Sequence, residues 1–141
     1  MNTAMELHDS RILQFTQSPD GTGDLLFYGH VYRSEGTPGS HLPQTSGWQN
    51  IRMCFTEMKF TGEPFEDNAF VSEGQLWLAD KANYGLLTFP IEFLRGVRLV
   101  MATANDFADR EIRAESISIR CEGDFEPESF WHEDGTVTPA A

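Results

Sequence analysis

The chain has 141 residues, enough for one domain that buries a hydrophobic core without disulfide or metal staples. Ten Lys and Arg residues stand against 22 Asp and Glu residues, which gives a formal net charge of −12. A field of this sign repels phosphate groups, so we expect neither a nucleic-acid partner nor an anionic membrane surface. An apolar fraction of 40%, with 11 phenylalanines, argues against disorder.

The first segment, residues 5–15, predicts a β-strand with a polar interruption. Apolar residues recur at every second position, but the tetrapeptide His-Asp-Ser-Arg lies at the centre. A turn-rich stretch leads to a second alternating segment at 24–33, so we predict a hairpin. An ion pair between Asp9 and Arg11, or a bulge near Asp9, would explain the polar centre.

The rest of the chain alternates between strand-like segments and two long breaks, at 34–47 and 61–74. The segment 90–96 begins with Pro and ends with Gly, which predicts a single helical turn. The further strands that the pattern predicts lie at 48–60, 75–80, 86–89, 97–103, 111–123 and 125–131.

Seven or eight strands without helical periodicity predict an all-β fold. We expect an antiparallel β-sandwich, because the long break after Arg33 is what a crossing between two sheets needs; a partly open β-barrel is the alternative. The expected domain covers residues 1–131, and residues 132–141 are expected to form a flexible C-terminal tail.

The hairpin gives a candidate binding surface. If Thr16 pairs with Asp24, one face collects two imidazoles, a serine hydroxyl and two phenols. A register that differs by one residue would separate these groups. The candidate ligand-binding residues are His8, Ser10, Tyr28, His30 and Tyr32.

The residue types of this surface bear on three kinds of chemistry. A hydrolytic triad is disfavoured, because on a regular strand Asp9 points away from His8 and Ser10. A metal site with His8 and His30 lacks an identifiable third ligand, so we predict no metal, no cofactor and no enzyme activity. Aromatic rings with polar tips suit sugars and similar amphipathic ligands.

The two long breaks are the expected contact surface for a protein partner, since long loops in a compact domain are commonly functional. Their acidic and aromatic side chains would meet a basic partner. The predicted partner-contact residues are Glu35, His41, Trp48, Glu63, Glu66 and Asp67.

The N-terminal residues, the apolar runs and the cysteines indicate the cellular compartment and the assembly state. No leader-like start and no run of 18 apolar residues are visible, which indicates a cytoplasmic protein with no membrane span. Cys54 and Cys121 lack CxxC neighbours and are expected to be thiols. A homo-oligomer formed through an exposed edge or loop is compatible with the pattern.

The segments "ELHDSRIL", "GHVYRSEGTPG" and "ESISIRCEGDFEPESF" resemble small bacterial all-β domains that open with an ELHDS motif. The resemblance covers most of the chain and implies no catalytic residue. The sequence therefore predicts a non-enzymatic interaction module with a basic protein partner, of which an immunity protein that neutralises a toxin is one version. The alternative is a module that binds a small, carbohydrate-like ligand through the aromatic and His face.

Overall fold

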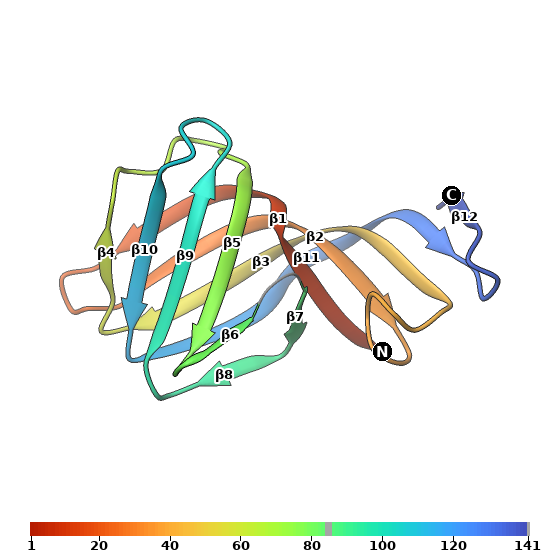
Figure 1. The fold of residues 1–141 in the computed structure, drawn as a ribbon, viewed down its shortest axis with the longest axis horizontal. Helices are drawn as coiled ribbons and strands as arrows, with labels where there is room; N and C mark the ends of the chain where they lie inside the picture. Colours follow the sequence, from red (N-terminus) through yellow and green to blue (C-terminus); the bar gives the residue numbers. More distant parts are fainter. Residues whose placement is uncertain (84–85, 141) are drawn as a thin grey trace.

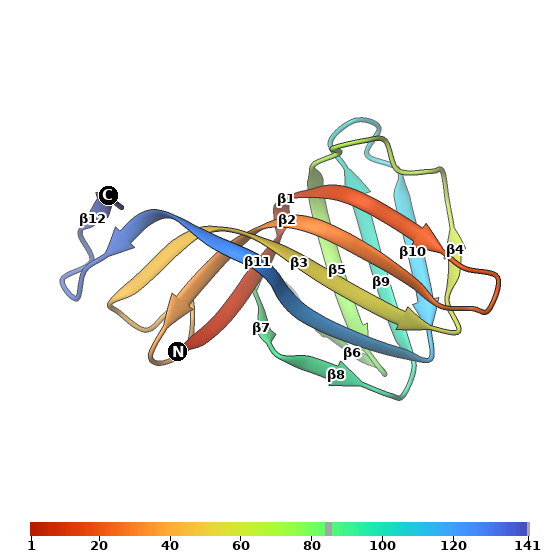
Figure 2. The same ribbon diagram turned by 180° about the vertical axis from the view of Figure 1, so that it is seen from behind.

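The protein is an antiparallel β-sandwich. The computed structural model describes residues 1–83 and 86–140, in which a seven-stranded and a five-stranded sheet pack face to face (Figures 1 and 2). The predicted fold class is confirmed, and the described residues form no closed barrel. There are more strands than the sequence predicts, because several have only three or four residues, too few to show an alternating pattern.

The large sheet is built on four long strands. Its spatial order is β12-β11-β3-β2-β1-β7, and β8 pairs with β11 on the same edge as β12. The four long strands are β1 (Asn2–Gln17), β2 (Gly23–Ser34), β3 (Gln44–Thr56) and β11 (Ser116–Trp131). The three short ones are β7 (Leu86–Phe89), β8 (Ile91–Phe93) and β12 (Val137–Pro139).

The small sheet covers one face of the large sheet. Its central strand, β9, pairs with β10 on one side and with β5 on the other. In spatial order its strands are β4 (Lys59–Thr61), β10 (Asp109–Ala114), β9 (Val97–Thr103), β5 (Val71–Leu78) and β6 (Lys81–Asn83).

The core lies between the two sheets and follows the period of two. On β2 the side chains of Leu25, Phe27 and Val31 are buried, whereas those of the intervening residues lie on the opposite, outer face. From the small sheet, Leu99 and Met101 of β9 meet them. A fully buried aliphatic or aromatic side chain contributes about 1.5–3 kcal/mol, so this layer supplies most of the stabilisation.

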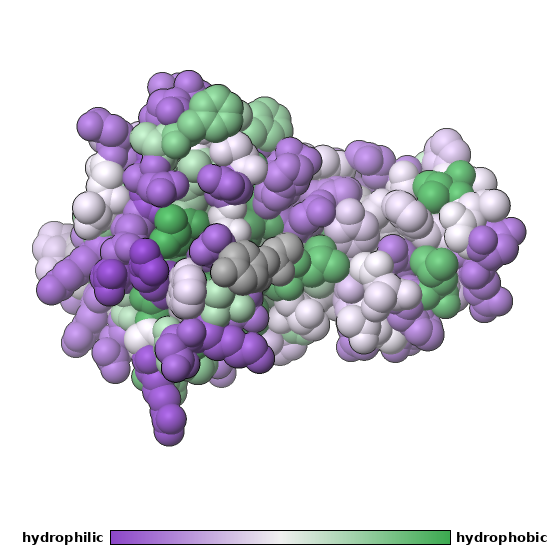
Figure 3. Space-filling view, in the orientation of Figure 1, coloured by the Kyte–Doolittle hydropathy of each residue, from purple (hydrophilic) through white to green (hydrophobic). Residues whose placement is uncertain are grey.

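The long strands run past the edge of the small sheet and form an arm (Figures 1 and 2). We define the arm as residues 2–4, 32–34, 44–47, 126–131 and 137–139. Apolar side chains are exposed both there and on the sandwich (Figure 3). The large exposed ones are Met1, Phe70, Leu94, Phe107 and Val137.

A four-residue bulge interrupts β1 at the polar tetrapeptide. Glu6 pairs with His30 and Arg11 pairs with Tyr28, so residues 7–10 of β1 lie opposite the single residue Gly29. Asp9 has a φ of 67°, a left-handed conformation that Asp tolerates better than most residues. The bulge that the sequence left as one alternative is therefore present.

Three other segments differ from their predictions. Residues 91–93 form β8 and pair with β11, where a helical turn was predicted. The first long break is shorter than predicted, since β3 already begins at Gln44, and it joins neighbouring strands of one sheet. The segment expected as a tail carries β12, which pairs with the end of β11.

Candidate functional site

Four rings form a row on the outer face of the large sheet, the face turned away from the core. We call Tyr28, His30 and Tyr32 of β2 and Trp48 of β3 the aromatic row. Tyr28 stacks on Trp48 with ring centroids 5.4 Å apart and planes 15° apart. His30 lies 4.9 Å from Trp48 and 5.0 Å from Tyr32, again between ring centroids. Such contacts hold the rings rigidly in place.

Every ring of the row directs a polar atom to a glutamate. The Tyr28 hydroxyl donates to Glu126 Oε2, and Trp48 Nε1 donates to Glu128 Oε2, both at 2.6 Å. Glu6 Oε2 lies 3.0 Å from His30 Nδ1 and 3.4 Å from the Tyr32 hydroxyl. Three carboxylates from β1 and β11 therefore border the row, and these pairs fix the ring orientations.

The three bordering carboxylates make the electrostatic potential along the row negative. Burial, and then the charge of Glu6, raise the pKa of Tyr32 to about 12, with smaller contributions from Asp9 and Glu128. The hydrogen bond to Glu126 raises the pKa of Tyr28. Arg11 lies 5.3 Å from the Tyr28 ring centroid and is the cation at that end of the row. The row can therefore accept positive charge at its Tyr32 end.

The structure separates the five residues that the sequence placed together. Tyr28, His30 and Tyr32 share the predicted face, but His8 and Ser10 do not join them, because the bulge shifts the register. His8 is exposed. Ser10 is fully buried, and its hydroxyl donates to the Glu6 carbonyl oxygen at 2.5 Å. Glu6 takes the position opposite His30 that was predicted for Ser10.

The predicted pairing of Asp9 with Arg11 is also replaced. Asp9 Oδ2 lies 3.1 Å from His8 Nδ1, so the left-handed residue brings together two side chains that a regular strand would separate. Both side chains are more than half exposed, so this pair contributes little to stability.

The predicted partner-contact residues do not form one surface. Glu35 and His41 are exposed in the loop at the end of the arm, beside the N-terminus, whereas Glu63, Glu66 and Asp67 are exposed on the sandwich (Figure 1). Trp48 belongs to a strand rather than a loop and lies in the aromatic row.

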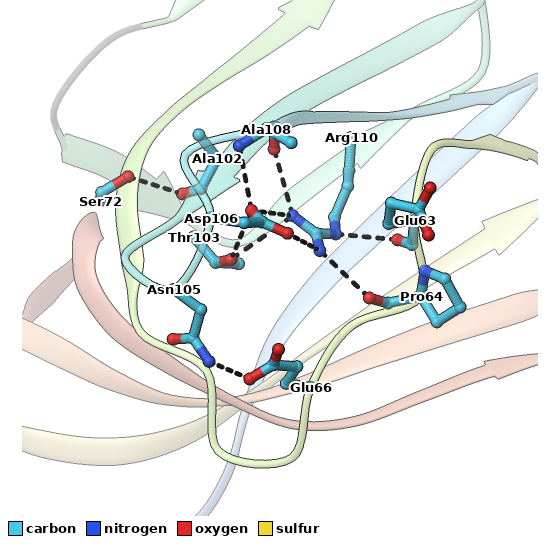
Figure 4. A network of polar contacts seen from close by, with 10 residues as sticks. All are labelled: Glu63, Pro64, Glu66, Ser72, Ala102, Thr103, Asn105, Asp106, Ala108 and Arg110. Atoms are coloured by element: carbon cyan, nitrogen blue, oxygen red, sulfur yellow. Dashed lines mark hydrogen bonds and ion pairs between the residues drawn. The ribbon is translucent and has the colours of Figure 1, made fainter.

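A buried arginine orders the second of these loops. Arg110, 2% exposed, donates to the carbonyl oxygens of Glu63 and Pro64 and forms a bidentate pair with Asp106 (Figure 4). Asn105 donates a further hydrogen bond to Glu66. The acidic side chains of this loop therefore rest on a backbone that is tied to the turn between β9 and β10.

Five hollows among the described residues lie away from the aromatic row. Their volumes run from about 300 to 540 Å³, and none of the five is lined by a ring of the row. Among residues 1–83 and 86–140, no group of three or more His, Cys, Asp or Glu side chains is placed to hold a metal ion. The same residues form no helix long and apolar enough to cross a membrane.

Sequence reasoning missed the three glutamates that border the row. Glu126 and Glu128 are two residues apart in β11, and on a regular strand this spacing predicts that both lie on one face, so it was a usable signal. Glu6 gave no such signal, because its position depends on the bulge that follows it.

Comparison with known proteins adds no assignment. The chain matches no protein-family model, no curated protein and no solved structure.

Proposed function

We propose that the protein is a non-enzymatic binding module whose aromatic row contacts a basic protein partner. The observation that carries this proposal is the combination of four half-buried rings with three carboxylates on one open sheet face. Aromatic side chains supply contact area at low entropic cost, and bordering carboxylates attract Lys and Arg side chains. An immunity protein that neutralises a basic toxin would be one protein of this class.

The shape of the site favours a macromolecule over a small ligand. Small-molecule sites are concave and bury most of the ligand surface, and the five hollows described above are lined by residues outside the row. A row that spans two strands offers instead a platform for a partner surface. For this reason the predicted carbohydrate-like alternative is not placed on the aromatic row.

The net charge of −12 supports a partner of positive charge. Long-range attraction between opposite charges raises the association rate and weakens as salt screens it. The dissociation rate would depend on the buried contacts of Trp48 and its neighbours rather than on the salt concentration.

The test uses a partner recovered by affinity capture from an extract of the source cells and then purified. Association and dissociation rates are measured by surface plasmon resonance at low and high salt. We expect the association rate to fall at least about tenfold at high salt. An association rate that does not respond to salt would overturn the basic-partner proposal.

Two variants of equal charge locate the contact. The variant E126Q/E128Q removes two carboxylates at the row, and the control E115Q/E133Q removes two exposed carboxylates elsewhere. We expect the first to weaken binding by roughly tenfold or more and the second by less than about twofold. Equal losses in both variants would show that only net charge matters and would contradict a site at the row.

A further inference from the structure

A second site lies on the same sheet face, at the end of the large sheet opposite the arm. A hollow of about 540 Å³ opens there between the turn that joins β1 to β2 and the end of β8. Its volume is in the range of small-molecule sites, and both polar and apolar groups line it. The hollow begins at Asp24, four residues and about 13 Å along β2 from Tyr28 of the aromatic row.

The floor of the hollow is a row of polar side chains across four neighbouring strands. In the observed register Thr16 pairs with Asp24, Asp24 with Cys54, and Cys54 with Ser118. These positions alternate with core residues such as Phe55, so their side chains share the outer face. Cross-strand neighbours lie about 5 Å apart, which is close enough for two adjacent side chains of the floor to contact one small ligand.

The carboxylate in this floor is held in a fixed orientation. Asp24 Oδ1 accepts a hydrogen bond from Thr16 at 2.7 Å, and Oδ2 accepts one from Arg52 at 3.1 Å. Arg52 is itself fixed by a bidentate pair with Glu122. A carboxylate can accept about four hydrogen bonds, so Asp24 keeps capacity for ligand hydroxyls.

The walls determine what kind of ligand fits. Ser18 and Thr22 add hydroxyl groups on one side, and Glu92 adds a second carboxylate on the other. Beside Glu92, the Leu94 side chain is 75% exposed and offers an apolar surface to C–H groups. Glu92 repels an anionic ligand, whereas the charge of Asp24 is paired with Arg52, and the many hydroxyl groups match a ligand that is itself rich in hydroxyl groups.

We propose that this hollow binds a neutral, polyhydroxylated ligand of monosaccharide size. Asp24 accepts hydrogen bonds from ligand hydroxyls, the Ser118 hydroxyl donates and accepts them, and Leu94 packs against a C–H face of the ligand. This site uses none of the residues of the aromatic row. The proposal of this ligand site can therefore be tested independently of the proposal that the aromatic row binds a basic protein partner.

Cys54 provides a reporter inside the hollow. It is a free thiol that lines the floor, whereas Cys121, the other free thiol, does not line it. The variant C121S leaves Cys54 as the only thiol, and its rate of alkylation by iodoacetamide can be followed by mass spectrometry. The probes are glucose, galactose and mannose, each at up to about 50 mM, which fills most of a site with a Kd of about 1 mM.

We expect at least one of the neutral sugars to slow the alkylation of Cys54 severalfold, and glucuronate at equal concentration to leave the rate unchanged. The variant C54S, with Cys121 as its only thiol, should show no protection. The proposal is overturned if none of the three sugars protects Cys54 and none shifts the backbone amide resonances of Asp24, Cys54 and Ser118.

Two substitutions separate binding from folding. S118A and D24N should each weaken the sugar's effect by about tenfold, because S118A removes a hydroxyl from the floor and D24N replaces one carboxylate acceptor oxygen with an amide donor. The control D80N changes an exposed aspartate that does not line the hollow. Unchanged amide spectra away from the floor establish that the variants are folded. Full sugar protection in folded S118A and D24N would contradict the site.

Discussion

Glu6 and His30 face each other across β1 and β2, with Glu6 Oε2 3.0 Å from His30 Nδ1. This pair exists because residues 7–10 bulge out of β1 opposite Gly29. Without the bulge, Glu6 would lie further along the sheet and the aromatic row would lack one of its three carboxylates. The polar centre of β1 thus acts on the site indirectly, by setting the register of its neighbours.

The bulge can be tested through its left-handed residue. Because Asp9 has a φ of 67°, the substitution D9V should destabilise the protein by about 1–2 kcal/mol, whereas D9G should be neutral or slightly stabilising. Urea unfolding followed by tryptophan fluorescence measures both. If D9V and D9G proved equally stable, the bulge would not be present in solution.

Ionisation of Tyr32 should lower the stability of the protein at alkaline pH. Its pKa in the folded protein is raised to about 12, above the ordinary value of 10.0, so the neutral phenol is the form that the fold favours. The stabilisation is therefore complete below pH 10 and is lost as the pH rises from 10 to 12. We expect Y32F to lose less stability than the wild type over this window, as measured by thermal unfolding. Identical alkaline losses in both proteins would contradict this assignment.

Protonation of Asp106 should lower the stability of the protein at acidic pH. Its hydrogen bonds to Arg110, and then to the Ala108 amide, lower the pKa to about 2 from 3.8. A lowered pKa means that the contribution to stability is present above 3.8 and is lost as the pH falls through 2. D106N should therefore show a smaller loss of stability between pH 4 and pH 2 than the wild type does. The control is D67N, in the exposed loop, which should follow the wild type. An acid profile of D106N that matches the wild type would rule out this role.

A glycine in the arm tests the packing of β3 against β11. A Cβ added at Gly47 would lie 2.2 Å from the Glu126 carbonyl oxygen and 2.8 Å from the Phe125 ring. Because backbone must move to accept it, G47A should cost about 1–3 kcal/mol. At Gly29 the nearest atoms are the side-chain carbons Ile51 Cγ1 and Met5 Cε, at 3.1 and 3.2 Å, so G29A requires a smaller shift and should cost less. Chemical unfolding of the two variants gives the comparison, and the reverse order of stability would contradict the arm geometry.

The sequence predicted the overall β-sandwich architecture better than it predicted which residues pair between strands. Alternation on the strands and turn residues between them were enough for the β-sandwich, which the structure confirms. One reason given for it was wrong, since the break after Arg33 joins two strands of the same sheet. The chain crosses instead between β3 and β4, where the sequence shows an unbroken strand-like segment.

The predicted hairpin register holds near the turn and fails beyond it. Phe15 pairs with Leu25 as expected, but Ile12 pairs with Phe27 after one irregularity, and the four-residue bulge shifts the register again. The position of a bulge depends on which side chains the opposite sheet can bury. The sequence of one strand alone does not contain this information. The candidate site was therefore half predicted: the β2 rings were found, and their carboxylate partners were not.

β11 passes from the sandwich into the arm, and its two halves experience different surroundings. Ile117 and Ile119 are buried in the core, whereas residues 126–128 are exposed on the part of the strand that the small sheet does not cover. Opening the first half requires disrupting the core, while the second half can open locally. Within one continuous strand, amide hydrogens therefore sample two free energies of opening, and Glu126 and Glu128 belong to the half with the lower one.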